Sequence, residues 1–184
     1  MRERILAAGA LPGFAGMMLD RRYDRDGALV ARDEVLRLRV FRHADGRSEA
    51  ILGWKGPTGV SPEGYKVRRE LEFELVSART APEALLEALG YRQIHAVERY
   101  VEYYHLGDTG VRLEWYPRMD VLIEVEGDQA GIESALTIIG LPRSAFTPEP
   151  LSFFAERYGA RTGRSAALAV AELSGGEVPS WDRR

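Results

Sequence analysis

The residues with the clearest chemical potential are Arg37 and Arg39, two positions apart in the stretch "DEVLRLRVFR" (residues 33–42). Leucines alternate with them, and successive side chains of a strand point to opposite faces, so both arginines share one face. Guanidinium groups are common ligands of phosphate and carboxylate in proteins. The pair therefore either meets water or points at an anion that needs two fixed positive charges.

Other alternating segments also carry charge on one face and apolar residues on the other. The charged positions are Lys55 in residues 49–55, Arg68, Glu70, Glu72 and Glu74 in residues 68–75, Arg112 and Glu114 in residues 110–116, and Glu124 and Glu126 in residues 119–126. One interpretation is a half-buried sheet whose charged side is solvated. The other is a sheet whose charged faces point inward, which the scarcity of neutral polar residues and the separation by sign favour. Buried charges need partners, and a polyanion with a divalent cation would satisfy both signs.

Periodicity and turn residues predict the elements that position these side chains. We expect helices in the first ten residues, over 80–90 with Thr80 as the N-cap, over 128–140, from Thr147 onward and over 165–173, and strands over 18–24, 34–42, 48–55, 66–76, 94–106, 110–116 and 119–126. Residues 56–65 are predicted to form a loop. Since no parallel crossover is implied, the predicted class is α+β, an antiparallel sheet or barrel with flanking helices. We expect one domain over residues 1–160, followed by a C-terminal helix and a loose tail over 161–184.

Composition narrows the function classes. The chain has 184 residues and a net charge of −3, which gives no basic footprint for duplex nucleic acid. It has no cysteine, so disulfides and sulfur ligands for zinc are absent. No apolar run approaches the roughly 20 residues needed to cross a bilayer, so we predict no membrane association and a cytoplasmic location.

Four segments, taken in order, resemble the CYTH family. They are "EVLRLRVFR", "ILGWKGP", "VRRELEFEL" and "VLIEVEG". The family contains class IV adenylate cyclases, thiamine triphosphatases and inorganic triphosphatases, and its members are also called triphosphate tunnel metalloenzymes. The resemblance covers roughly residues 1–158. It implies an antiparallel eight-stranded barrel whose tunnel takes a triphosphate together with Mg²⁺ or Mn²⁺.

The resemblance also implies roles for individual residues. The triphosphate-binding residues would be Arg37, Arg39, Lys55, Arg68 and Arg99, and the metal ligands would be Glu70, Glu72, Glu114, Glu124 and Glu126. The chain departs from the family pattern in four respects. The N-terminal strand reading E-x-E-x-K is missing, Gly53 replaces a threonine, Val101 replaces a basic residue, and Arg22 stands where an aromatic residue is usual.

The departures leave two explanations open. Either the natural start lies upstream of Met1, or the chain is a divergent member whose barrel lacks one strand. In the second case, a homodimer or the tail after residue 160 could cover the open edge. The leading hypothesis is a metal-dependent phosphohydrolase acting on inorganic tripolyphosphate, thiamine triphosphate or a nucleoside triphosphate. The alternatives are a catalytically impaired nucleotide- or polyphosphate-binding protein, a class IV adenylate cyclase, and a structural dimer without a ligand.

Overall fold

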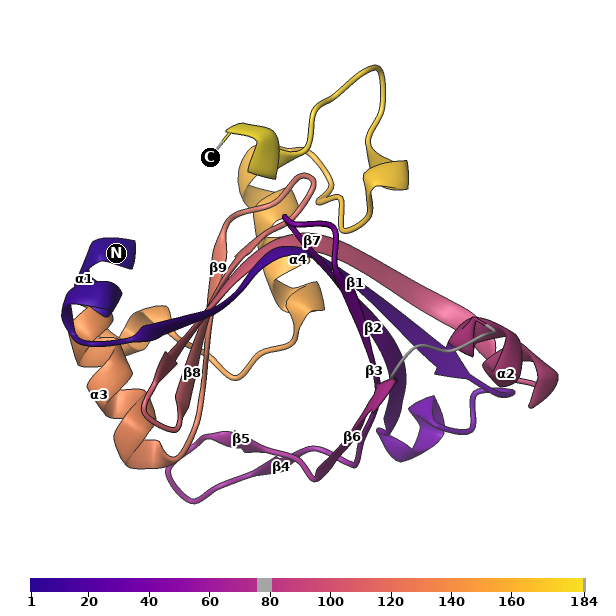
Figure 1. The fold of residues 1–184 in the computed structure, drawn as a ribbon, viewed down its shortest axis with the longest axis horizontal. Helices are drawn as coiled ribbons and strands as arrows, with labels where there is room; N and C mark the ends of the chain where they lie inside the picture. Colours follow the sequence, from indigo (N-terminus) through magenta and orange to yellow (C-terminus); the bar gives the residue numbers. More distant parts are fainter. Residues whose placement is uncertain (76–80, 184) are drawn as a thin grey trace. The chain divides into compact units, whose positions relative to one another are not determined.

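The structure, a computed structural model, describes residues 1–75 and 81–183 (Figure 1). Its helices are α1 (Arg2–Ala7), α2 (Pro82–Ala88), α3 (Gln129–Ile139) and α4 (Leu151–Thr162). Its strands are β1 (Leu11–Asp24), β2 (Val35–His43), β3 (Ser48–Lys55), β4 (Gly59–Val60), β5 (Lys66–Val67), β6 (Glu70–Leu75), β7 (Arg92–Leu106), β8 (Thr109–Trp115) and β9 (Leu122–Glu126). Thr80, the predicted N-cap of α2, lies outside the described residues.

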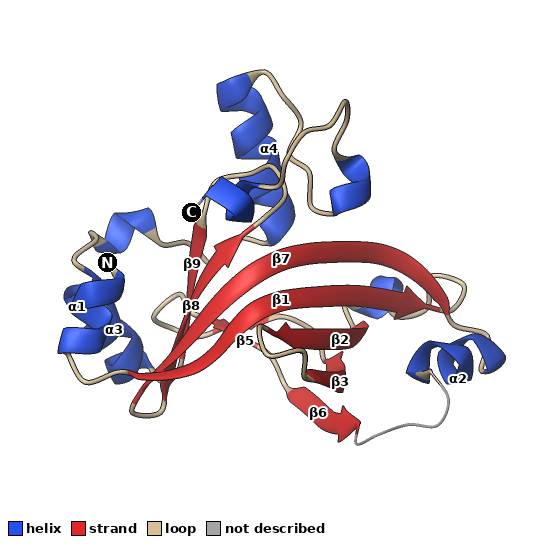
Figure 2. Ribbon diagram, turned by 45° about the horizontal axis from the view of Figure 1, so that its top comes forward, coloured by secondary structure: helices blue, strands red, loops and turns tan. Residues whose placement is uncertain are grey.

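Seven of these strands form one antiparallel sheet in the hydrogen-bonded order β6-β3-β2-β1-β7-β8-β9, and β4 pairs only with β5 (Figure 2). The prediction of an α+β fold with a large antiparallel sheet is confirmed. The sheet order ends at β6 and β9, so these are its edge strands among the described residues. The first described element is α1, and none of the described strands has the E-x-E-x-K pattern.

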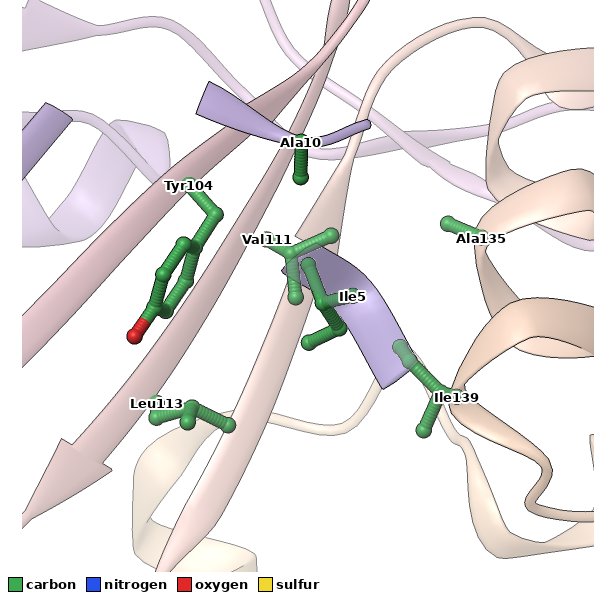
Figure 3. Close-up of a cluster of buried hydrophobic side chains, with 7 residues drawn as sticks. All are labelled: Ile5, Ala10, Tyr104, Val111, Leu113, Ala135 and Ile139. Carbon is green, nitrogen blue, oxygen red and sulfur yellow. The ribbon is translucent and has the colours of Figure 1, made fainter. Parts of the chain in front are cut away.

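The chain divides into two compact units, and one of them comprises Met1–Gly16 and Arg99–Arg184. Its apolar core brings together α1, α3 and the apolar faces of β7 and β8 (Figure 3). The buried members are Ile5, Ala10, Tyr104, Val111, Leu113, Ala135 and Ile139. Helix α3 begins where Asp128 accepts a hydrogen bond from the Gly131 N–H at 2.7 Å, and it ends at Gly140 in the left-handed conformation. Both ends match the prediction.

The other unit comprises Met17–Glu98. Here Leu38 of β2 and Leu86 of α2 are buried in one cluster, against which Leu36 and Leu52 also pack. Helix α2 thus covers the even-numbered face of β2. Because side chains alternate along a strand, Arg37 and Arg39 lie on the opposite face of the sheet.

The C-terminal segment differs from the prediction of a helix over 165–173 followed by a loose tail. Helix α4 ends at Thr162, and beyond it the chain forms only the short 3-10 turns η3 (Val170–Glu172) and η4 (Ser180–Arg183). Ala167 forms an isolated antiparallel bridge with Arg118, and the Ser180 N–H donates to the Pro117 carbonyl at 2.9 Å. The helix propensity of "SAALAVAEL" is overridden by this pairing with a distant turn of the same unit.

The remaining differences in the elements are local. A small hairpin of β4 and β5 occupies the predicted loop, and the strand predicted over 66–76 is interrupted at residues 68 and 69. Within residues 1–75 and 81–183, no helix combines the length and apolar character needed to cross a bilayer.

Candidate functional site

A cluster of charges forms on the face of β2, β3 and β6 that lies opposite α2. In the strand register, Arg37 stands across from Gly53, and Gly53 stands across from Glu72. Lys55 in turn stands across from Glu70. Residues directly opposite in an antiparallel pair share a face, so these side chains project from the same side of the sheet. Arg37 and Glu72 meet over Gly53, where a Cβ would lie 3.6 Å from Arg37 and 3.7 Å from Glu72 Oε1, at ordinary van der Waals distance.

Each cation of this group contacts a glutamate of β6. Arg37 Nη2 lies 3.2 Å from Glu72 Oε1, and Arg39 Nη2 donates a hydrogen bond to the same oxygen. Lys55 Nζ donates to Glu70 Oε1 at 2.5 Å. We call Arg37, Arg39 and Lys55 the basic cluster. The structure brings together five of the predicted site residues here, three cations and two carboxylates.

Burial is uneven within this group of charges. The side chains of Arg37 and Arg39 are 12% and 5% exposed, and that of Lys55 is 17% exposed. Glu70 and Glu72 are 38% exposed. The interpretation of a fully solvated charged face is therefore wrong for the arginines. The cations are largely withdrawn from water, whereas the two carboxylates on the edge strand retain contact with it.

Asp20 of β1 also belongs to this site, although no sequence motif indicated it. Its side chain is 4% exposed, and its Oδ2 lies 3.8 Å from Arg37 Nη1. Arg37 Nε is buried and has no hydrogen-bond acceptor in the described part of the chain. The available signal was an acidic residue directly after the apolar residues of "GMMLD", and a carboxylate that is buried there needs a cation.

Arg68 does not join the basic cluster. Its Nε donates to the Gly56 carbonyl at 2.6 Å, and its Nη2 donates to the Asp33 carbonyl at 2.5 Å. Asp33 also accepts a hydrogen bond from the Thr58 N–H, so these residues tie together the base of the β4–β5 hairpin. In this structure, Arg68 therefore positions the backbone next to Lys55 and has its guanidinium engaged by carbonyls.

The unit that comprises Met1–Gly16 and Arg99–Arg184 has a buried charged group of its own. Arg99 Nε lies 3.1 Å from Glu114 Oε1, and the Tyr116 hydroxyl donates to Glu114 Oε2 at 2.5 Å. Burial raises the pKa of the Glu114 carboxyl, and the positive charge of Arg99 opposes that shift. Burial, aided by the Glu114 charge, also raises the pKa of Tyr116 well above its usual value, so its hydroxyl remains a donor.

Arg112, which the family resemblance did not place in the site, pairs with both glutamates of β9. Its Nη1 donates to Glu124 Oε2 at 3.0 Å, and its Nη2 donates to Glu126 Oε2. Burial lowers the pKa of Arg112, but the charges of Glu124 and Glu126 raise it by more. This guanidinium therefore stays charged and holds the two carboxylates that were predicted to bind metal.

The five carboxylates predicted as metal ligands do not fit a resident metal centre as the structure places them. Glu70 and Glu72 contact the basic cluster, Glu124 and Glu126 contact Arg112, and Glu114 contacts Arg99. Among the described residues, no group of three or more His, Cys, Asp or Glu side chains could hold a metal ion. Binding of Mg²⁺ or Mn²⁺ stays a prediction.

Comparison with known proteins identifies the fold. No family model matches the sequence, and a search of curated proteins gives no match. Solved structures do match. The PH1819 protein from Pyrococcus horikoshii is 20% identical with a TM-score of 0.60, over 89% of this chain and 93% of that one. A proposed adenylate cyclase from Vibrio parahaemolyticus is 14% identical with a TM-score of 0.64, over 85% and 92%.

The same fold occurs in a quite different setting. The Mediator head module from Schizosaccharomyces pombe contains a chain that is 15% identical with a TM-score of 0.51, over 80% of this chain and 90% of that one. These likenesses show that the chain shares an α+β fold with those structures, and they support the CYTH-like fold that the sequence motifs predicted. At these identities the likeness establishes the fold alone, so function has to be argued from the site.

Proposed function

We propose that the basic cluster binds the phosphate groups of a triphosphate-bearing small molecule. The observation that carries the proposal is the burial of Arg37 and Arg39 side by side on one face, 12% and 5% exposed, with Lys55 on the neighbouring strand. Burying cations is costly unless anions compensate them. A site that keeps three cations on a rigid sheet is therefore suited to a ligand with several negative charges.

The chemistry of the donors supports phosphate as that ligand. Guanidinium groups bind phosphate through two parallel N–H···O bonds, and a lysine adds a compact point charge. Arg37 Nε is buried without an acceptor in the described residues, so a phosphate oxygen could satisfy it. The likeness to a proposed adenylate cyclase agrees with a nucleotide or another triphosphate as the ligand.

The reaction that we propose for this site is hydrolysis of the bound triphosphate, and the candidate substrates are inorganic tripolyphosphate, thiamine triphosphate and a nucleoside triphosphate. Mg²⁺ or Mn²⁺ would enter with the phosphates, since Mg²⁺ is commonly held by one or two carboxylates plus substrate oxygens and then neutralises developing charge. Class IV cyclase chemistry and binding without turnover are the alternatives. We also propose a cytoplasmic location, with which the lack of cysteine is consistent. The formation of a homodimer stays a prediction.

Calorimetric titration of the wild-type chain with tripolyphosphate in EDTA tests the binding step. We expect saturable binding that weakens as salt is raised, because exposed charge interactions are screened. Titration with sulfate at equal ionic strength is the control for general anion binding. Tripolyphosphate that gives no saturable heat, or that binds no more tightly than sulfate, would contradict the proposal.

Turnover is tested separately by phosphate release from tripolyphosphate and ATP with Mg²⁺ or Mn²⁺, comparing wild type with Arg39→Ala, which removes one cation of the basic cluster. Metal-dependent release that the substitution reduces supports the hydrolase. Binding without release assigns the chain to the binding proteins, and release of pyrophosphate from ATP with formation of cyclic AMP assigns it to the cyclases.

A further inference from the structure

The basic cluster is electrically neutralised by the protein itself. Three cations, Arg37, Arg39 and Lys55, face three carboxylates, those of Asp20, Glu70 and Glu72, within ion-pair distance. With three positive and three negative charges, the net formal charge of the group is zero. A polyanion that approached this arrangement would meet the carboxylates as well as the cations, and like charges repel at close range.

The three carboxylates differ in how readily they can move away from the cations into solvent. Asp20 is 4% exposed on β1, which has strands on both sides, so its charge cannot reach water without disrupting the sheet. Glu70 and Glu72 are 38% exposed and project from β6, an edge strand. A rotamer change returns either carboxylate to solvent at a low desolvation cost. The arginines, at 12% and 5%, have no such freedom.

We propose that Glu70 and Glu72 are displaceable counterions, which occupy the anion site in the unliganded protein and are expelled by the incoming polyanion. This inference rests on the proposed function and gives the two glutamates a role other than metal binding. Their presence keeps buried cations paired when no ligand is bound. It also sets a threshold for the ligand, because an anion with few charges cannot replace two carboxylates at once. The site would therefore select tripolyphosphate over inorganic phosphate.

Binding of tripolyphosphate in EDTA to Glu72→Gln and Glu70→Gln variants tests this inference. Each variant removes one competing charge while it keeps the side-chain shape, so we expect tripolyphosphate to bind about tenfold more tightly than to wild type. The selectivity over inorganic phosphate should fall at the same time. Glu74→Gln is the matched control, since Glu74 is an exposed residue on the same face of β6, opposite Ile51. We expect no change in its affinity.

Thermal unfolding provides a second readout, because removal of a counterion also leaves the arginines less well paired. Glu72→Gln should unfold at a lower temperature than wild type without ligand, and saturating tripolyphosphate should raise its unfolding temperature by more than it raises that of wild type. If Glu72→Gln unfolds during purification, Glu72→Asp, which retracts the charge by one methylene, should still bind more tightly than wild type.

The outcomes separate this inference from the proposed function. Unchanged or weaker tripolyphosphate binding by both glutamine variants, with wild type binding normally, overturns the counterion role and leaves the anion site standing. An equal gain for Glu74→Gln also overturns it, because the effect would then be one of general surface charge. Absence of binding by wild type and all variants overturns both.

Discussion

Arg39→Ala is expected to weaken tripolyphosphate binding about 100-fold, because hydrogen bonds to charged groups contribute roughly 1.5–3 kcal/mol each and Arg39 can form two with a phosphate. Arg39 is the most buried cation of the basic cluster, 5% exposed, and its guanidinium also lies over the Phe41 ring at 5.6 Å. Its removal leaves Glu72, which retains contact with water. The fold should therefore survive, and calorimetry of the variant in EDTA provides the measurement.

A substitution on the opposite face of the same strand controls for the loss of a positive charge. Arg42 is exposed and lies at an even position of β2, so Arg42→Ala should bind tripolyphosphate as wild type does. Arg39→Lys should be intermediate, since lysine keeps the charge and loses the planar fork. Equal losses for Arg39→Ala and Arg42→Ala would show that net charge, and no particular site, governs binding.

Arg99→Ala is expected to lower the free energy of unfolding by about 3–5 kcal/mol at neutral pH, the usual cost of removing one partner from a buried ion pair. Arg99 and Glu114 are 8% and 5% exposed, so the remaining carboxylate cannot reach water. Urea denaturation followed by circular dichroism measures the loss. In the double variant Arg99→Ala/Glu114→Gln both charges of the pair are removed and no carboxylate is left buried without its cation, so much of the stability should return.

The loss of unfolding free energy in Arg99→Ala should depend on pH in a defined direction. The pKa of Glu114 is already raised by burial, and loss of the opposing Arg99 charge raises it further. A carboxyl whose pKa is higher in the folded state than in the unfolded state, about 4.3, favours folding when it is protonated. The deficit should therefore shrink as the pH falls from 7 through the raised pKa. A deficit that stays constant or grows on acidification would contradict this assignment.

The strand faces could be predicted from the sequence because alternation is a local property. The predicted strand over 48–55 matches β3. The odd-numbered positions of Arg37, Arg39 and Lys55 placed all three on one face. The alternation of positions along a strand cannot show which cation meets which carboxylate, because cross-strand partners depend on register. The pairing of Glu72 with both arginines across Gly53 therefore emerges only from the structure.

Three other features depended on contacts distant in sequence. Asp20 was missed, although it lies in the strand predicted over 18–24, because the sequence does not reveal that its carboxylate faces Arg37 of β2. Arg68 was assigned to the site by the family resemblance, on a predicted strand over 66–76 that the structure interrupts at residues 68 and 69. The tail was called loose because the sequence does not reveal that Arg118 pairs with Ala167 and that its guanidinium donates to the Ser165 carbonyl and to Glu177.

A crystal structure of the chain with tripolyphosphate, grown without divalent metal, tests the central claim most directly. We predict phosphate oxygens within hydrogen-bond distance of the guanidinium groups of Arg37 and Arg39 and of Lys55 Nζ, with the carboxylates of Glu70 and Glu72 turned toward solvent. A fully occupied anion bound elsewhere, with the basic cluster still paired to both glutamates, would contradict the account.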